Sequence, residues 1–97
     1  MTHVRRFPIY GLSASTMFVG STAGGVAIVA TNLSRANLKL QPLVDALRIS
    51  PNGSVTGSSM LVATAAIFEP PDGFTGPLFA QPNAGATSAV AVWESSF

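Results

Sequence analysis

The sequence predicts an all-β fold, a small antiparallel sandwich or barrel of about six to eight short strands. Turn-forming residues recur along the chain, with nine glycines and seven prolines among 97 residues. The runs between them are short and rich in β-branched side chains, which suit a pleated surface. A chain of this length can bury one hydrophobic core, so we expect a single β domain over residues 1–97.

The first eleven residues, MTHVRRFPIYG, are predicted to form an extended N-terminal arm or an edge strand. Pro8 lacks the backbone N–H that a central strand needs, and Arg5 and Arg6 would point to opposite faces of a strand. An arm of this kind can reach a neighbouring molecule.

Residues 17–32, MFVGSTAGGVAIVATN, allow three interpretations. A membrane helix needs roughly 20 apolar residues, and this run is shorter and interrupted by glycine, serine and threonine. An export signal would use the two preceding arginines, but Pro8 and Tyr10 interrupt the continuous apolar helix that such a signal requires. We therefore prefer a β-hairpin or meander.

In that hairpin, residues 15–19 and 26–31 are strands, and the connection between them is GSTAGG. Its glycines can adopt the positive φ angles that a turn requires.

The next segment predicts a strand with one wet face, because Lys39 stands between Leu38 and Leu40, and Pro42 ends it. The following residues are ambiguous, since leucine and valine recur at helical spacing up to Leu47. We expect one short helix up to about Ala46 and a strand after it. Asn52-Gly53 then predicts a hairpin loop of roughly three to five residues.

The apolar run from Met60 to Phe68 fits a strand or a helix, and its β-branched residues favour a strand. Residues 69–86 contain four prolines and three glycines, so they are predicted to form a long extended loop. The last run alternates Ala89 and Ala91 with Val90 and Val92, which is typical of a strand buried on both faces. The single tryptophan, Trp93, is accordingly expected in the core, although with Tyr10 it could instead form a binding platform.

The charge content is the most informative property of the chain. Only 9% of the residues are charged and 47% are hydrophobic, whereas soluble domains average about 25% charged residues. A net charge of +1 gives little repulsion between copies, so we expect the surface to be covered by protein partners, most simply in a homo-oligomer. The residues that we expect to bind partners are Arg5, Arg6, Phe7, Tyr10, Phe74, Leu78, Phe79 and Phe97.

Several chemical functions lack the residues that they need. The chain has no cysteine, and its single histidine, His3, lies in the N-terminal arm, where a catalytic triad is poorly supported. Glu69 and Asp72 are the only carboxylates close in sequence, and they are most simply solvated loop residues. Five basic residues form no cationic stripe for nucleic acid. We expect no enzyme activity, cofactor, metal site, nucleic-acid binding or membrane span.

These observations lead us to expect a structural subunit that assembles through a low-charge surface into a homo-oligomer or a larger shell. Within that class we expect a component of a virion, such as a viral or phage capsid decoration or minor structural protein. The alternative is a secreted ligand-binding or adhesin-like β module, with its site in the loop around Phe74 and Phe79.

Overall fold

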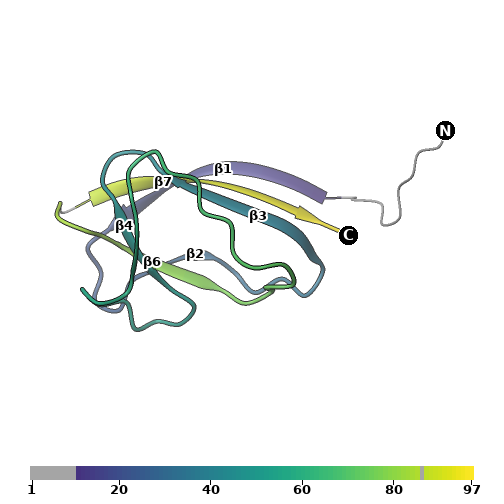
Figure 1. The fold of residues 1–97 in the computed structure, drawn as a ribbon, viewed down its shortest axis with the longest axis horizontal. Helices are drawn as coiled ribbons and strands as arrows, with labels where there is room; N and C mark the ends of the chain where they lie inside the picture. The colour runs from purple at the N-terminus through teal and green to yellow at the C-terminus, as the bar shows by residue number, and fades with distance from the viewer. Residues whose placement is uncertain (1–10, 86) are drawn as a thin grey trace.

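The computed structural model describes residues 11–85 and 87–97, and in this part of the chain the fold is an all-β sandwich without a helix (Figure 1). Seven strands form two antiparallel sheets, which confirms the predicted fold class. The strands are β1 (Gly11–Gly20), β2 (Val26–Val29), β3 (Arg35–Pro42), β4 (Leu47–Ser50), β5 (Met60–Val62), β6 (Leu78–Pro82) and β7 (Thr87–Ser96).

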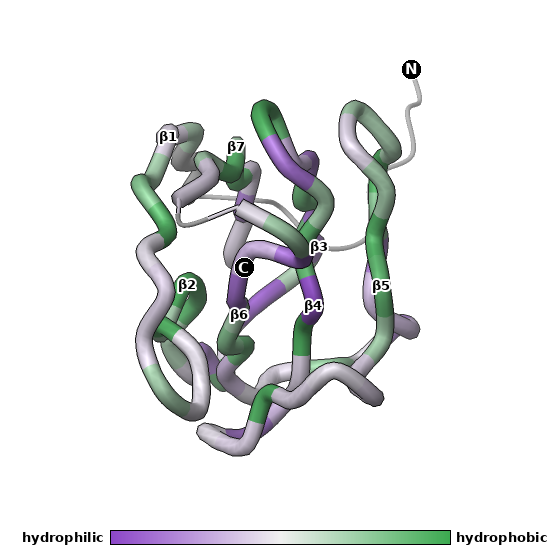
Figure 2. The backbone as a smooth tube through the Cα atoms, turned by 90° about the vertical axis from the view of Figure 1, so that its left-hand side faces the viewer, coloured by the Kyte–Doolittle hydropathy of each residue, from purple (hydrophilic) through white to green (hydrophobic). Residues whose placement is uncertain are grey.

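One sheet has three strands in the order β1-β7-β3, and the other has four in the order β2-β6-β4-β5. Figure 2 looks along the sandwich and shows the two sheets as separate layers. The core lies between them, because alternate residues of each strand point inward. It contains twelve buried residues: Val19, Ile28, Val29, Leu38, Leu40, Leu47, Ile49, Val62, Leu78, Ala80, Val90 and Val92. The predicted alternation around Lys39 is confirmed, since Lys39 is exposed between two buried leucines.

The predicted strands at residues 15–19 and 26–31 exist in β1 and β2, but the prediction that they form a hairpin is wrong. β1 pairs with β7 along its whole length, and β2 pairs with β6 in the opposite sheet. Val19 and Ile28 are both buried, and they meet in one core because their strands lie in opposite layers. The connection turns at Gly24 and Gly25, whose φ angles are +80° and +100°.

The short helix expected up to Ala46 does not form. Pro42 is the last residue of β3, and the N–H of Leu43 donates to the carbonyl of Ala89 at 2.8 Å, so the pairing with β7 continues. The apolar residues at helical spacing therefore do not share one buried face: Leu47 is buried, whereas Leu43 and Val44 are exposed. After the bend, β4 and β5 form the predicted hairpin, with a longer connection than expected.

The strand predicted from Met60 to Phe68 ends at Val62. Ala65 has a φ of +68°, and its N–H donates to the carbonyl of Pro42 at 2.8 Å, so the chain leaves the four-stranded sheet. It then runs beside β3, where the backbones of Leu40 and Phe68 exchange hydrogen bonds of 2.9 and 2.8 Å.

The predicted extended loop over residues 69–86 is wrong for its centre, because Leu78–Pro82 form β6. This strand lies between β2 and β4, and Leu78 and Ala80 alternate into the core. The local density of proline and glycine concealed a strand of only five residues.

Candidate interaction surface

The three-stranded sheet has an outer face that the second sheet does not cover. In β1, β7 and β3, one set of alternate residues fills the core, so the other set points away from the second sheet. The strand register places these outward residues side by side in rows. The outer face consists of Ala14, Thr16, Phe18, Asn37, Lys39, Gln41, Leu43, Ala89, Ala91, Trp93 and Ser95.

Large apolar side chains on the outer face are open to solvent. Phe18 is 69% exposed, Leu43 43% and Trp93 37%. Phe18 and Leu43 flank Ala89 from the two neighbouring strands, and Trp93 lies two residues further along β7 than Ala91. Patches of exposed apolar side chains on a soluble protein commonly mark interaction sites.

An open hollow of about 350 Å³ lies at the Trp93 end of the outer face. Trp93 and Ile67 supply its main apolar walls, and Ile67 is 59% exposed. Ile67 reaches this position because the neighbouring Phe68 is hydrogen-bonded to β3. The remaining lining residues are Asn37, Lys39, Glu94 and Ser95.

The outer face carries one charged side chain, Lys39. Its Nζ lies 4.0 Å from Oε2 of Glu69, and both side chains are about half exposed. A pair of this kind contributes little to stability, but it leaves no unpaired charge on the face. The outer face is therefore close to neutral in charge, and six of its eleven residues are apolar.

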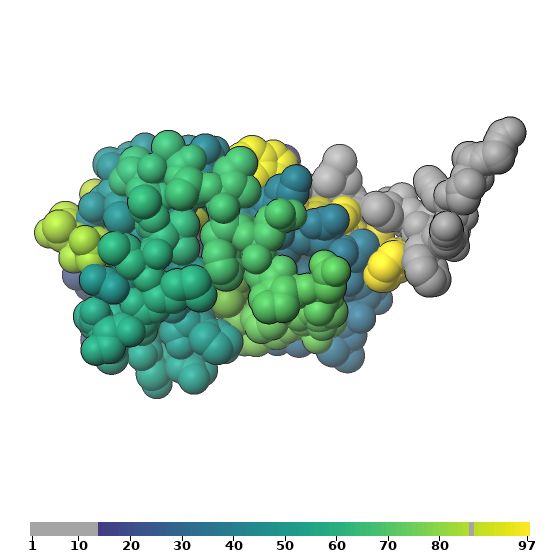
Figure 3. Space-filling model, in the orientation of Figure 1, coloured from purple at the N-terminus to yellow at the C-terminus, as the bar shows by residue number. Residues whose placement is uncertain are grey.

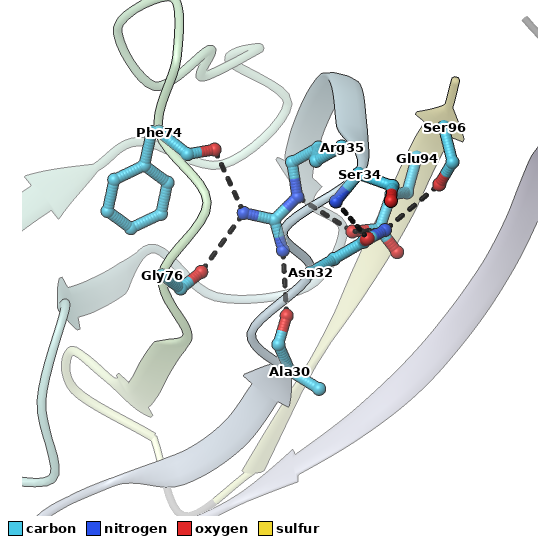
Figure 4. Close-up of polar contacts among 8 residues, drawn as sticks. All are labelled: Ala30, Asn32, Ser34, Arg35, Phe74, Gly76, Glu94 and Ser96. Atoms are coloured by element: carbon cyan, nitrogen blue, oxygen red, sulfur yellow. Dashed lines mark hydrogen bonds and ion pairs between the residues drawn. The ribbon is translucent and has the colours of Figure 1, made fainter.

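The strongest polar cluster in the described residues is structural, and it surrounds the buried side chain of Arg35 (Figure 4). Nε of Arg35 donates to Oε2 of Glu94 at 2.7 Å, and the side-chain exposures of the two residues are 2% and 22%. The other guanidinium nitrogens donate to the carbonyls of Phe74, Gly76 and Ala30 at 3.1, 3.0 and 2.7 Å. With four of its five N–H donors paired in this way, the buried guanidinium joins β3, β7 and two connections and is not open to a substrate.

Asn32 extends this cluster. Its Nδ2 donates to Oγ of Ser96 at 2.9 Å and to Oε2 of Glu94 at 3.4 Å, while its Oδ1 accepts from the N–H of Ser34 at 3.0 Å. The Arg35 guanidinium also lies 5.7 Å from the ring centre of Phe74. The sequence reasoning missed this cluster, although an arginine and a glutamate in two apolar strands of a low-charge chain were a usable signal.

Asp45 holds together the two connections at one end of the outer face. Its Oδ2 accepts the N–H groups of Ala84 and Gly85 at 2.9 and 2.8 Å. Hydrogen bonds from Gly85 and Ala84 lower the pKa of Asp45 below its ordinary value of 3.8. The backbone of Asp45 also exchanges two hydrogen bonds of 2.9 Å with the hydroxyl of Ser88. These contacts fix the bend that exposes Leu43.

The structure describes four of the residues predicted to bind partners, Phe74, Leu78, Phe79 and Phe97. Arg5, Arg6, Phe7 and Tyr10 lie outside the described residues. Leu78 is only 4% exposed, so its side chain belongs to the core and is not available to a partner in this fold.

The three predicted phenylalanines differ in their exposure to solvent. Phe74 is partly buried against the core and beside Arg35, and Phe79 is partly buried in β6 near Gly25. Phe97 is 52% exposed, and its N–H donates to the carbonyl of Ser34 at 2.8 Å.

Among the side chains, the largest difference from the prediction concerns the burial of Trp93. It was expected in the core because it follows two buried valines, but its position in the alternation places it with Ala89 and Ala91 on the outer face. Phe18 was not considered as a surface residue. The two-residue period of β1 offered a signal, since Val19 is inward and its neighbour must then be outward.

Glu69 and Asp72 line a second hollow of about 320 Å³ beside the Arg35 cluster, together with Pro70, Pro71 and Phe74.

Among the described residues, no group of three histidine, cysteine or acidic side chains lies close enough to hold a metal ion. In the same part of the chain, no helix has the length and hydrophobicity to span a membrane. Comparisons of the chain with protein-family models, with curated proteins and with solved structures found no significant match.

Proposed function

We propose that this chain is a structural subunit that assembles through its low-charge surface into a homo-oligomer or a larger shell. One observation carries the proposal: Phe18, Leu43 and Trp93 are exposed together on the outer face of a β sandwich. The chain has nine charged residues in total, and two of them, Arg35 and Glu94, pair with each other inside the molecule. Few charges remain to keep this face in water, so contact with protein is its favourable environment.

Within this class, the proposed setting is a viral or phage particle, as a capsid decoration or minor structural protein. Small and hydroxyl-bearing residues, such as Ala14, Thr16 and Ala91 on the outer face, allow close contact and lose little side-chain entropy on assembly. Those properties suit a subunit that is permanently packed against others. An antiserum against the chain should then detect it in particles purified from its source, and its absence from them would contradict this setting.

Assembly is tested by light scattering coupled to size exclusion at micromolar concentration. We expect a mass above the 9.9 kDa of one chain. The double variant Phe18→Ser/Trp93→Ser should lower the oligomeric mass, because it removes two exposed apolar groups from the outer face. Leu33→Ser is the matched control, since Leu33 is 84% exposed in the turn between β2 and β3 and lies outside that face.

The single tryptophan provides a second measurement. Trp93 lies on the outer face, so its fluorescence should shift to shorter wavelength as the concentration rises and the face is covered. A chain that remains monomeric at all concentrations, with unchanged emission, would contradict the assembly proposal. Repeating the measurement on a chain that begins at Tyr10 separates assembly through the outer face from assembly through the N-terminal arm.

A secreted ligand-binding module is the second candidate, and the hollow beside Trp93 and Ile67 is the observation that favours it. Its apolar walls suit a small apolar ligand better than the loop around Phe74 and Phe79, where both side chains are partly buried. Quenching of Trp93 fluorescence by a panel of apolar ligands tests this candidate.

A further inference from the structure

β1 is a long edge strand, and no described segment pairs with its free side. It forms ten consecutive pairs with β7 from Gly11 to Gly20, without a register shift. Ala14, Ser15 and Thr16 are all exposed, although neighbouring residues of a strand point to opposite faces. At residues 14–16, β1 is therefore open on both faces as well as along its edge.

The other edges of the two sheets are short or covered. Residues 65–68 run along β3 and form hydrogen bonds with Leu40 and Pro42. Beside β2, the backbone of Gly24 pairs with Val55. β5 has only three residues. Figure 3 shows how the connections after β4 and β5, coloured teal to green, spread over the side of the molecule that faces the viewer.

β1 also lacks the features that prevent strands from pairing with other molecules. Natural edge strands are usually interrupted by charged side chains, prolines or bulges. The sequence of β1, GLSASTMFVG, contains no charged residue and no proline, and its register contains no bulge. A strand with unpaired backbone groups and no charge does not repel a second copy of itself.

We propose that β1 pairs edge to edge and antiparallel with β1 of a second copy of this chain, across a two-fold axis. This inference rests on the proposed function and specifies how two subunits join through their edges, which leaves both outer faces uncovered for contact with further subunits. An axis perpendicular to the sheet places equivalent strands antiparallel and keeps the same face outward in both copies. The two three-stranded sheets then become one six-stranded sheet, and the two outer faces become one continuous apolar surface with Phe18 of each copy near the junction.

Symmetry restricts the register of this pairing. In an antiparallel pair, two directly opposite residues point to the same face of the sheet. The two-fold axis must therefore pass midway between one residue of β1 and the same residue of the second copy. The Cα atoms of that residue and its equivalent would lie about 4.5–5.5 Å apart, within the range of a disulfide bond. Residues one position away would be about 8 Å apart, because each strand residue advances about 3.4 Å, and that distance is too long for a disulfide.

Single-cysteine variants test the pairing directly, since the chain has no cysteine of its own. We would introduce cysteine in turn at Ala14, Ser15, Thr16 and Met17, and oxidise each variant at micromolar concentration. The expected result is a covalent dimer that peaks at one position and falls sharply at its neighbours. Ser54→Cys is the control, because Ser54 is exposed in the connection between β4 and β5.

A charge variant supplies an independent measurement. Thr16→Lys places two like charges beside the proposed junction and should raise the dissociation constant of the dimer at least about tenfold. Thr64→Lys adds the same charge to an exposed turn and should leave the dissociation constant unchanged. Circular dichroism of both variants checks that each is folded.

The outcomes separate this inference from the proposed function. Cross-linking at one β1 position, together with dissociation by Thr16→Lys, supports the β1 pairing. An oligomer that resists Thr16→Lys, shows no β1 cross-link and yet dissociates on Phe18→Ser/Trp93→Ser overturns the β1 pairing and leaves the proposed function standing. A protein that is monomeric throughout, or that uses β1 only to bind a strand from a different protein, overturns the pairing of two copies.

Discussion

Replacing Arg35 by methionine tests whether the buried ion pair holds the sandwich together. Methionine keeps the volume of the side-chain stem but removes all the guanidinium donors. The Glu94 carboxylate then loses its partner at 2.7 Å, and the carbonyls of Ala30, Phe74 and Gly76 lose theirs. Removing one partner of a buried pair typically costs about 3–5 kcal/mol, much of it from the charge that is left behind.

Two features decide where in that range the loss should fall. The Glu94 side chain is 22% exposed and can gain some hydration, which reduces the cost. Three carbonyls without a donor add to it, at about 1 kcal/mol each. We therefore expect the free energy of unfolding to fall by at least about 3 kcal/mol. For a domain of this size, that loss lowers the Tm by roughly 12–24 °C.

The assay is urea unfolding followed by Trp93 fluorescence at one fixed protein concentration, because association also affects apparent stability. Arg48→Met is the control. Arg48 donates to Asn83 and to the carbonyl of Ser59 at 3.1 and 3.0 Å, but it is more exposed than Arg35, so its loss should cost less than about 1 kcal/mol. Equal losses for the two variants, or a loss below about 1 kcal/mol for Arg35→Met, would refute the structural role assigned to the pair.

Two further predictions concern the connections. The lowered pKa of Asp45 means that its ionised form stabilises the fold above pH 3.8, and that this stabilisation is lost as the pH falls through the lower folded value. Asp45→Asn should therefore flatten the decline of Tm below about pH 4, and an unchanged decline would show that Asp45 does not cause it. Gly24→Ala should cost at least about 2 kcal/mol, since its φ is +80° and a Cβ would overlap the carbonyl oxygen of Gly53. Gly57→Ala, with no atom within 4 Å of the added Cβ, should change unfolding by no more than about 0.5 kcal/mol, and similar losses for the two alanine variants would contradict the steric argument.

Local patterns predicted those parts of the fold that depend on local periodicity. The strand around Lys39 was recognised because a two-residue alternation is a property of neighbouring residues alone. The final strand was recognised for the same reason, and β7 is the central strand of its sheet. The prediction that both of its faces are buried is wrong, because Trp93 on the outer face is 37% exposed. The predicted helix up to Ala46 was wrong, because some of the apolar residues at helical spacing are buried and others are exposed. The predicted loop was wrong at Leu78–Pro82, where prolines near both ends of a short segment favoured a loop although the segment forms a strand.

The candidate site was less predictable than the fold. The low charge of the chain indicated an uncovered surface, but the residues assigned to it were taken from loops and termini. Two exposed apolar residues of the outer face, Phe18 and Trp93, lie instead on regular strands, and the third, Leu43, directly follows β3. Each strand pattern shows that two faces differ, and it does not show which face another sheet will cover.

Composition and short-range alternation were sufficient to predict a β fold with few surface charges, although the same local patterns also predicted a short helix up to Ala46 that does not form. The tertiary structure decided that β1 and β2 separate into opposite sheets, that Arg35 is buried and that Trp93 is exposed. These outcomes depend on contacts between residues far apart in the chain, such as Arg35 with Glu94. Such contacts depend on how side chains from all parts of the chain pack together in the core, and a local sequence pattern contains no information about that packing.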